Sequence, residues 1–150
     1  MITQTSIDKS ILIRGPRSRV WRALTTPSEF GKWFGADVRG EFRPGERVDM
    51  VCTIKGYEGV RFFIIVNEMK PEATFSWHWH PGSAVPDGDS PEPMTLVEFH
   101  LTEAEGGTLL PVSESGFDAI SLAKRAKAYE ENVQGWDHQL QSIKTYVEGQ

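Results

Sequence analysis

The sequence predicts an α+β fold, in which an antiparallel sheet packs against one long C-terminal helix. Strand-like segments joined by short turns fill most of the chain between Lys9 and Ser115, and strands joined by hairpins pair antiparallel. The final segment, Ala119 to about Glu148, instead repeats apolar residues at spacings of three and four, the period of an amphipathic helix. That apolar stripe consists of Leu122, Ala126, Tyr129, Val133, Trp136, Leu140, Ile143 and Val147.

One strand and two short helices are expected at the start of the chain. Residues 7–14 carry isoleucines on one parity, which is typical of a half-buried strand. Residues 17–24 have apolar side chains at helical spacing. Thr26 then precedes Pro27, an N-cap followed by proline at the first helical position. A second short helix should therefore run to Phe34, and the glycine after it should end the helix.

The middle of the chain reads as strands separated by turns. Residues 60–69 are apolar without alternation, which favours a central strand with little exposure on either face. Residues 74–80 alternate cleanly between aromatic and polar side chains. Residues 81–93 hold several prolines and should form a loop. The remaining strands are expected at residues 46–54, 95–101 and 109–115.

Composition excludes several classes of function. A chain of 150 residues should form one domain that buries about 70 % of its unfolded surface. Its net charge of −5 argues against binding nucleic-acid phosphates. The single cysteine, Cys52, rules out an internal disulfide and a cysteine-rich zinc site. The N-terminus has no apolar core of a signal peptide, and no apolar run reaches membrane-spanning length. We therefore expect a cytoplasmic protein that binds neither nucleic acid nor membrane.

Several short motifs resemble a known family. They are Val20 to Pro27, Lys32-Trp33-Phe34, Gly107-Thr108, Glu114-Ser115-Gly116-Phe117, and Gly135-Trp136 with Leu140. Together they resemble the domain shared by activators of the Hsp90 ATPase and their bacterial homologues, within the START/Bet v 1-like helix-grip superfamily. The resemblance covers essentially the whole chain. It implies a curved sheet wrapped around the C-terminal helix, two short helices closing one end, and a cavity between them.

Aromatic residues are the candidate lining of that cavity. Phe75, Trp77 and Trp79 share a parity, and this face must turn toward the helix, because exposing it would favour aggregation. These residues could equally form a filled core. Trp21, Trp33 and Phe34, three aromatic residues of the two short helices, could either anchor those helices to the sheet or close one side of a pocket. The candidate ligand-binding residues are Trp33, Phe34, Phe75, Trp77, Trp79, Phe99, Glu114, Phe117, Tyr129, Val133, Trp136 and Leu140.

Glu114 is the sharpest polar candidate. It shares the inward parity of Leu110 and Val112. Burial of a charged carboxylate is costly without a partner, so either the group is protonated or a hydrogen-bond donor approaches it. It could anchor a ligand hydroxyl or serve as a general acid or base. Alternatively it lies at the solvated rim or pairs with an arginine.

The histidines do not predict a metal site. If Trp77 pairs with Phe99, then His78, His80, Glu98 and His100 gather on the outer face of neighbouring strands. Side chains at a spacing of two on a flat sheet diverge, whereas zinc needs three or four ligands that converge. A solvated face or a homodimer contact fits better. No metal or cofactor is therefore expected.

These features favour binding of a small hydrophobic, aromatic ligand between the sheet and the C-terminal helix. A different possibility is an Hsp90-type co-chaperone or another protein-interaction module. The eukaryotic activator, however, also carries a separate amino-terminal domain, for which 150 residues leave no room. A third possibility is a cyclase or hydrolase using Glu114, with Tyr57, Tyr129 or a histidine as proton carrier. No catalytic motif supports it, so no catalytic residue is assigned.

Overall fold

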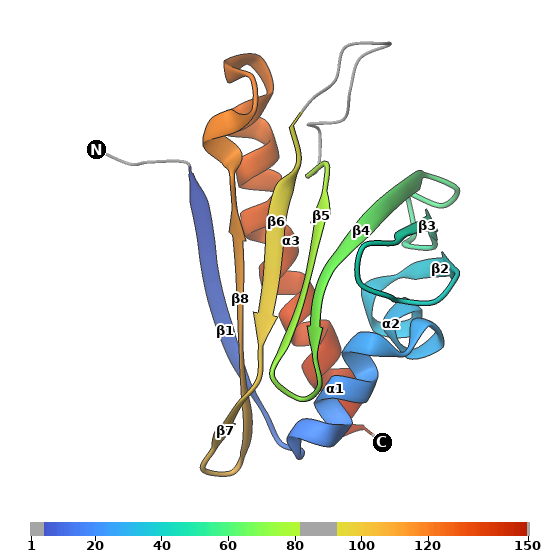
Figure 1. Ribbon diagram of the computed structural model, residues 1–150, viewed down its shortest axis with the longest axis vertical. Helices are drawn as coiled ribbons and strands as arrows, with labels where there is room; N and C mark the ends of the chain where they lie inside the picture. Colours follow the sequence, from blue (N-terminus) through green and yellow to red (C-terminus); the bar gives the residue numbers. More distant parts are fainter. Residues whose placement is uncertain (1–4, 82–92, 150) are drawn as a thin grey trace.

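A computed structural model describes residues 5–81 and 93–149, and within them the chain forms one antiparallel sheet of eight strands (Figure 1). The strand order is β1-β8-β6-β5-β4-β3-β2, with β7 paired to β8 off this path. The strands are β1 (Ser6–Ile13), β2 (Ala36–Arg39), β3 (Arg47–Cys52), β4 (Arg61–Lys70), β5 (Thr74–Trp79), β6 (Thr95–His100), β7 (Thr102–Ala104) and β8 (Gly107–Ser115).

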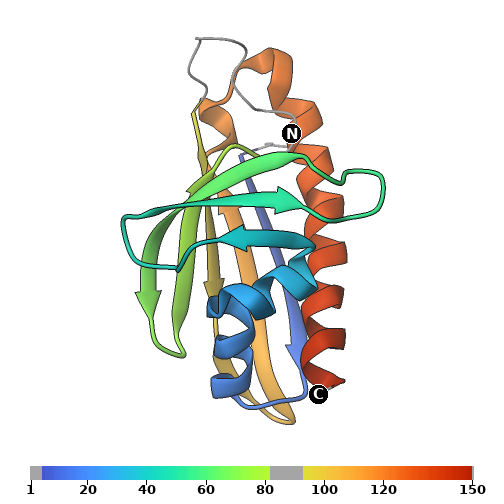
Figure 2. The same ribbon diagram turned by 90° about the vertical axis from the view of Figure 1, so that its right-hand side faces the viewer.

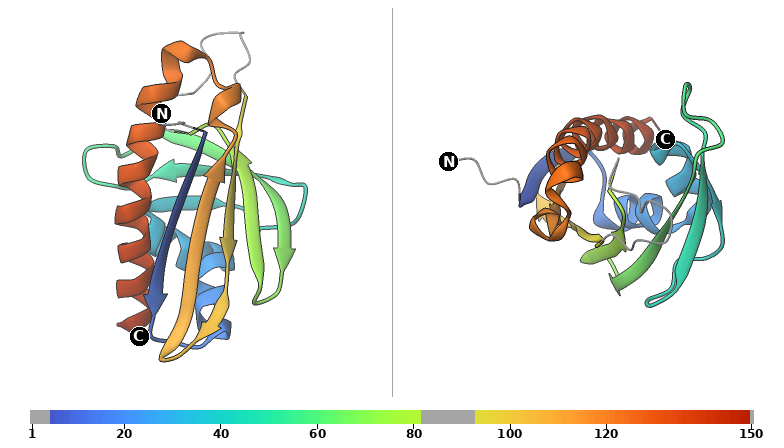
Figure 3. Two further views of the ribbon diagram at one scale, coloured as in Figure 1. Left: turned by 90° about the vertical axis from the view of Figure 1, so that its left-hand side faces the viewer. Right: turned by 90° about the horizontal axis from the view of Figure 1, so that it is seen from above.

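The helices complete the predicted α+β architecture. They are α1 (Arg17–Thr25), α2 (Pro27–Phe34) and α3 (Leu122–Glu148), with a 3₁₀ turn, η1 (Phe117–Ala119), before α3. The sheet bends around α3, and α1 and α2 lie across the inside of its curve near one end (Figures 2 and 3). The predicted curved sheet around a long helix is therefore confirmed. None of the helices in the described residues is long and apolar enough to cross a bilayer.

The second short helix follows its sequence signals closely. Thr26 occupies the N-cap position and Pro27 the first turn of α2. Gly35 ends the helix in the left-handed conformation, with φ of 88°. A side chain is disfavoured there for a second reason, because a Cβ would lie 2.5 Å from the side chain of Ile54. Local signals therefore place Phe34, the last residue of α2, against the sheet.

The long helix begins three residues after Ala119, where the predicted segment starts. Residues 117–119 form the separate turn η1, and α3 begins at Leu122 after Ser121 in the N-cap position. Leu122 is 80 % exposed and Ala126 is also exposed, although both belong to the predicted stripe. The first turns of α3 lie at the end of the sheet away from α1 and α2 (Figure 1). Helical spacing indicates a shared face but not how far the sheet extends along it.

The pairing of Trp77 with Phe99, on which the outer histidine cluster depended, does not occur in the structure. Phe75, not Trp77, pairs with Phe99, and Trp77 pairs with Val97. The shift is two residues, so each side chain keeps its face and the aromatic face still turns inward. The proposed outer cluster changes, however, because His78 now lies opposite Leu96 and His100 opposite Thr74. In the part of the chain that the structure describes, no group of three or more His, Cys, Asp or Glu could hold a metal ion.

Two smaller differences concern the strands. Strand β4 is not buried on both faces: Ile64 and Val66 are buried, but Phe62, Phe63 and Ile65 are only partly so. The short strands β2 and β7 were not predicted. The predicted loop at residues 81–93 lies almost entirely outside the described residues.

The core inside the curve is a continuous aromatic cluster. Phe30 of α2 packs its ring against those of Trp33, Phe34, Phe42 and Trp77. Trp77 of β5 continues the cluster toward α3, where its ring centroid lies 6.3 Å from that of Trp136. Phe30 and Trp77 have no exposed surface. Rings therefore join α2 to the sheet and to α3, and Trp21 joins α1 to the same cluster through its edge-to-face contact with Phe75.

A charged junction joins the three helices near the surface. Glu29 of α2 accepts hydrogen bonds from Arg19 Nη1 of α1 (2.7 Å) and from the Tyr146 hydroxyl of α3 (3.0 Å), and it forms an ion pair with Arg22 (3.2 Å). Burial acts to raise the pKa of Glu29, but these hydrogen bonds and positive charges outweigh it and lower the pKa below its ordinary value of 4.5.

We expect this junction to stabilise the fold above about pH 4.5 and to weaken in acid. Because the pKa of Glu29 is lower in the folded protein than in the unfolded chain, its contribution is lost as pH falls through the folded pKa. Glu29→Gln should lower the free energy of unfolding by about 1–2 kcal/mol at pH 7, and the gap to wild type should narrow toward pH 3. Urea denaturation of wild type and variant at pH 7 and pH 3 measures the difference in their free energies of unfolding. An equal difference at both pH values would show that the charge of Glu29 does not stabilise the junction.

Candidate ligand-binding site

Glu114 of β8 is a fully buried carboxylate that accepts four hydrogen bonds from neutral donors among the described residues. Oε2 accepts from Trp79 Nε1 of β5 (2.9 Å) and from the Thr95 hydroxyl of β6. Oε1 accepts from Asn132 Nδ2 and Trp136 Nε1 of α3, each at 2.8 Å. The expectation that hydrogen-bond donors approach Glu114 is therefore confirmed. The carboxylate does not lie at a solvated rim, and these four partners include no arginine.

This arrangement makes Glu114 a positioning residue. A carboxylate has about four lone-pair sites, and the four donors occupy them. The group therefore has little capacity left for proton transfer. Its bonds instead connect β5, β6 and α3 to β8, and they hold the indole rings of Trp79 and Trp136 by their N–H groups. The two ring centroids are 5.9 Å apart.

Beside these indoles lies a small, partly open pocket of about 100 Å³. It lies where the end of α2, the end of β5 and the middle of α3 meet. Its walls are mostly rings and amides, contributed by Phe34, Trp79, Asn132, Gly135, Trp136 and Gln139. An apolar cavity of roughly 150 Å³ takes up benzene. A pocket of about 100 Å³ therefore encloses only part of one aromatic ring, and the rest of the ring would lie at its open side.

Gly135 keeps the helix side of the pocket open. An added Cβ at this position would meet no atom within 4 Å. A glycine inside a helix can allow close approach of the sheet or leave space for a ligand, and the open surroundings of Gly135 do not fit the first role. A glycine in a helix interior costs about 1 kcal/mol relative to alanine, so the chain forgoes stability at this position.

We expect Gly135→Ala to raise the free energy of unfolding by up to about 1 kcal/mol, because the methyl group meets open space and alanine favours the helix. Gly31→Ala in α2 is the matched control. There the new Cβ would lie 2.3 Å from the carbonyl oxygen of Ala36, so the same substitution should destabilise the protein. Thermal unfolding of both variants tests the contrast, and a destabilised Gly135→Ala would show that this space is already filled.

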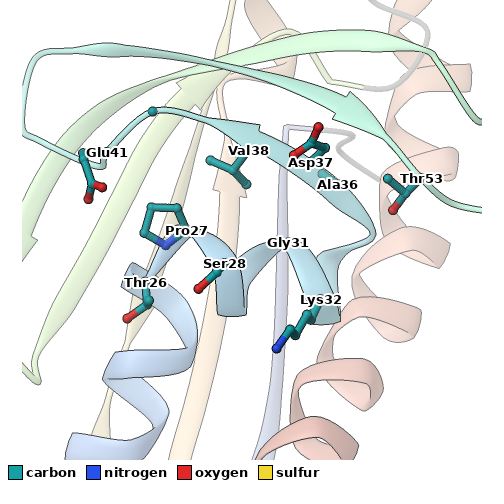
Figure 4. Close-up of a pocket in the computed structure, with 11 residues that line it drawn as sticks. Thr26, Pro27, Ser28, Gly31, Lys32, Ala36, Asp37, Val38, Glu41 and Thr53 are labelled. Carbon is teal, nitrogen blue, oxygen red and sulfur yellow. The ribbon is translucent and has the colours of Figure 1, made fainter.

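A larger hollow of about 820 Å³ lies elsewhere, between α2 and β2 (Figure 4). Its lining includes short polar and charged side chains such as Thr26, Ser28, Lys32 and Asp37. None of the residues predicted to bind a ligand lines it. Ligand sites are predominantly apolar and aromatic with a few placed polar groups. The chemistry of the walls therefore favours the smaller pocket over the larger hollow.

Comparison with known proteins now places the chain in a family. The family model described as "Activator of Hsp90 ATPase homolog 1-like protein" matches residues 14–148. The chain belongs to this family. The match confirms the resemblance inferred from the motifs at both ends of the chain. No curated protein matches the sequence significantly.

Solved structures share the fold of this Hsp90-activator-like chain. Protein MLL2253 from Mesorhizobium loti is 21% identical, with 96% of this chain and 97% of that chain covered and a TM-score of 0.77. The Aha1 dimer from Colwellia psychrerythraea is 22% identical, with 99% and 97% covered and a TM-score of 0.72. DynU16, a putative protein in the dynemicin biosynthetic locus, is 22% identical with a TM-score of 0.73; 96% of this chain but only 47% of DynU16 is covered. At these identities the likeness shows the fold alone.

The predicted ligand residues of this Hsp90-activator-like domain fall into three groups. Three of them line the pocket, namely Phe34, Trp79 and Trp136, and Glu114 bonds to the two tryptophans. A second group lies in the core without lining the pocket: Trp33, Phe75, Trp77, Phe99, Val133 and Leu140. The third is the pair Phe117 and Tyr129 near the start of α3. Their rings meet edge to face, and the Tyr129 hydroxyl donates to the Ser6 carbonyl.

Three polar residues of the site were not predicted. Asn132 and Gln139 line the pocket, and Thr95 completes the hydrogen bonding of Glu114. Asn132 and Gln139 lie four residues before and three residues after Trp136, so helical spacing places them on the same face. That signal was available in the sequence. Thr95 carries no comparable signal, because only the strand register brings it next to Glu114.

Proposed function

We propose that this protein binds a small hydrophobic molecule with an aromatic ring in the pocket between Phe34, Trp79 and Gly135. The supporting observation is the pair of indoles that Glu114 holds at the edge of an unfilled space. Without a ligand nothing requires an open space there, because a larger residue at position 135 would gain helix propensity and contacts. The rings of Phe34 and Trp136 both lie about 6 Å from that of Trp79 and offer a planar ligand apolar walls.

The remaining predicted residues contribute by supporting these walls. In this proposal Phe34, Trp79 and Trp136 touch the ligand, and Glu114 orients the two indoles from behind. Phe75, Trp77 and Phe99 form the buried layer behind the walls, with Trp33, Val133 and Leu140 around it. Phe117 and Tyr129 anchor the far end of α3.

Blocking the pocket should abolish binding. Thermal-shift and native mass spectrometry screens against aromatic metabolites identify binders of the wild-type protein. Gly135→Leu, whose side chain would project into the space that Gly135 leaves open, should lose the thermal shift for every binder. Gln134→Leu is the matched control, because it adds the same side chain at the neighbouring exposed position of α3. Binders that stabilise Gly135→Leu as well as wild type would overturn the proposed site.

The family membership supports a second candidate, a co-chaperone role toward an Hsp90-type ATPase. The family is described by its likeness to an activator of the Hsp90 ATPase. Under this proposal, saturating protein should raise the ATPase rate of the Hsp90 from the same organism. An unchanged rate would exclude activation.

Self-association is a further proposal, supported by the likeness to a structure described as an Aha1 dimer. Sedimentation equilibrium across a hundredfold range of concentration would show a dimer if it forms. A monomer mass throughout would contradict the proposal.

A further inference from the structure

Gln139 of α3 is a buried amide with one end bonded and the other free. The residue is 9% exposed and lines the pocket one helical turn beyond Gly135. Its Nε2 donates to the Phe34 carbonyl oxygen at 2.8 Å. Its Oε1 is fully buried and has no hydrogen-bond partner among the described residues. A buried acceptor left without a partner costs about 1–3 kcal/mol, so this oxygen requires an explanation.

The orientation of the amide is fixed by its neighbour. Turning the amide over would place its oxygen against the carbonyl oxygen of Phe34, which also only accepts. The unpaired atom is therefore an acceptor and not a donor. In the described residues the only other buried side-chain polar atom without a partner is Trp77 Nε1, and Trp77 does not line the pocket.

The other polar groups of the pocket narrow the choice of ligand. The N–H groups of Trp79 and Trp136 donate to Glu114, so these walls offer ring faces and edges rather than donors. Three residues that line the pocket, Trp79, Asn132 and Trp136, bond directly to the Glu114 carboxylate. A charge this close and this buried is weakly screened, so an anionic ligand would be repelled.

We propose that the pocket recognises an uncharged aromatic ring bearing an O–H or N–H group. Because Gln139 Oε1 has no exposed surface in the structure, binding includes a small movement of the pocket walls that lets this group donate a hydrogen bond to Oε1. Phenols and anilines are the simplest members of this class. The inference rests on the proposed function and specifies its ligand chemistry. A site built to bond a ligand donor discriminates strongly against the analogue that lacks it, because its own polar group is then left unpaired.

Phenol and toluene form the matched probe pair, since they share one ring and similar size but only phenol can donate. Titration of the wild-type protein, followed by the assigned indole N–H resonances of Trp79 and Trp136, should give a dissociation constant about five- to tenfold lower for phenol. Gln139→Met retains the side-chain length without the acceptor and should abolish this preference. Benzoate should bind more weakly than phenol.

Ser142→Ala is a control that distinguishes loss of the Gln139 acceptor from a general loosening of α3. The Ser142 hydroxyl donates to the Trp33 carbonyl at 2.6 Å, so it makes the same kind of α3-to-α2 bond without lining the pocket. This variant should keep the preference for phenol. Equal binding of phenol and toluene to wild type, or an unchanged preference in Gln139→Met, would overturn this inference and leave the pocket intact. If neither probe perturbs the indole resonances, the proposed function itself fails.

Discussion

Glu114→Gln is expected to lower the free energy of unfolding by about 3–5 kcal/mol. The substitution keeps one oxygen, which can still accept two of the four hydrogen bonds. The new NH₂ group would face the remaining donors, and those buried N–H or O–H groups would lose their partner. The bonds to a charged acceptor would also be replaced by weaker neutral ones. Chemical denaturation measures the change.

Glu98→Gln is the matched control for this prediction. Glu98 lies on the adjacent strand β6 but is only half-buried, so its substitution should change stability by less than about 0.5 kcal/mol. The indole N–H resonances provide a second measurement. Glu114→Gln should move the signals of Trp79 and Trp136 and leave that of Trp33, which donates to the Ala23 carbonyl, in place. A stability loss no greater than in the control would show that the carboxylate does not position the indoles.

Phe30→Ala is the second change with a large expected effect, a loss of about 3–5 kcal/mol. Phe30 has no exposed surface, and its ring packs against four others that belong to α2, β5 and the segment before β3. Removing the ring opens a cavity where α2 meets the sheet. Because Phe34 stacks on Phe30 with centroids 4.7 Å apart, ligand affinity should fall as well. Thermal unfolding and the phenol titration measure the two effects.

Leu122→Ala tests the exposed start of α3 in the same assay. Leu122 belongs to the apolar stripe by spacing, yet it is 80 % exposed. Its substitution should change stability by less than about 0.5 kcal/mol. A loss comparable to that of Phe30→Ala would mean that the first turn of α3 packs against the protein after all.

The sequence predicted best those features that depend on residues close together in the chain. Thr26, Pro27 and Gly35 mark the limits of α2 through capping and backbone preferences that operate within one turn. Strand parity placed Glu114 on the inner face because alternation is a local property. The exposed start of α3 was missed because the extent of the sheet beside a helix is not encoded in the spacing of its residues.

The candidate site could be predicted only in outline, because it depends on register and on packing between distant elements. Thr95 reaches Glu114 through the pairing of β6 with β8, and a two-residue change of register leaves the sequence pattern unaltered. Whether aromatic side chains fill a space or border it depends on how rings from α2, β5 and α3 fit together. Parity put Trp77 and Trp79 on one face, yet only Trp79 lines the pocket.

We expect an aromatic ligand to bind between Phe34, Trp79 and Trp136. Nuclear Overhauser effects between bound phenol and the wild-type protein locate the ligand without any substitution. They should connect the phenol ring protons to the indole protons of Trp79 and Trp136 and to the Gly135 α-protons. Contacts to Lys32 and Val38 in the α2–β2 hollow instead, or no contact at saturating phenol, would contradict binding at this site.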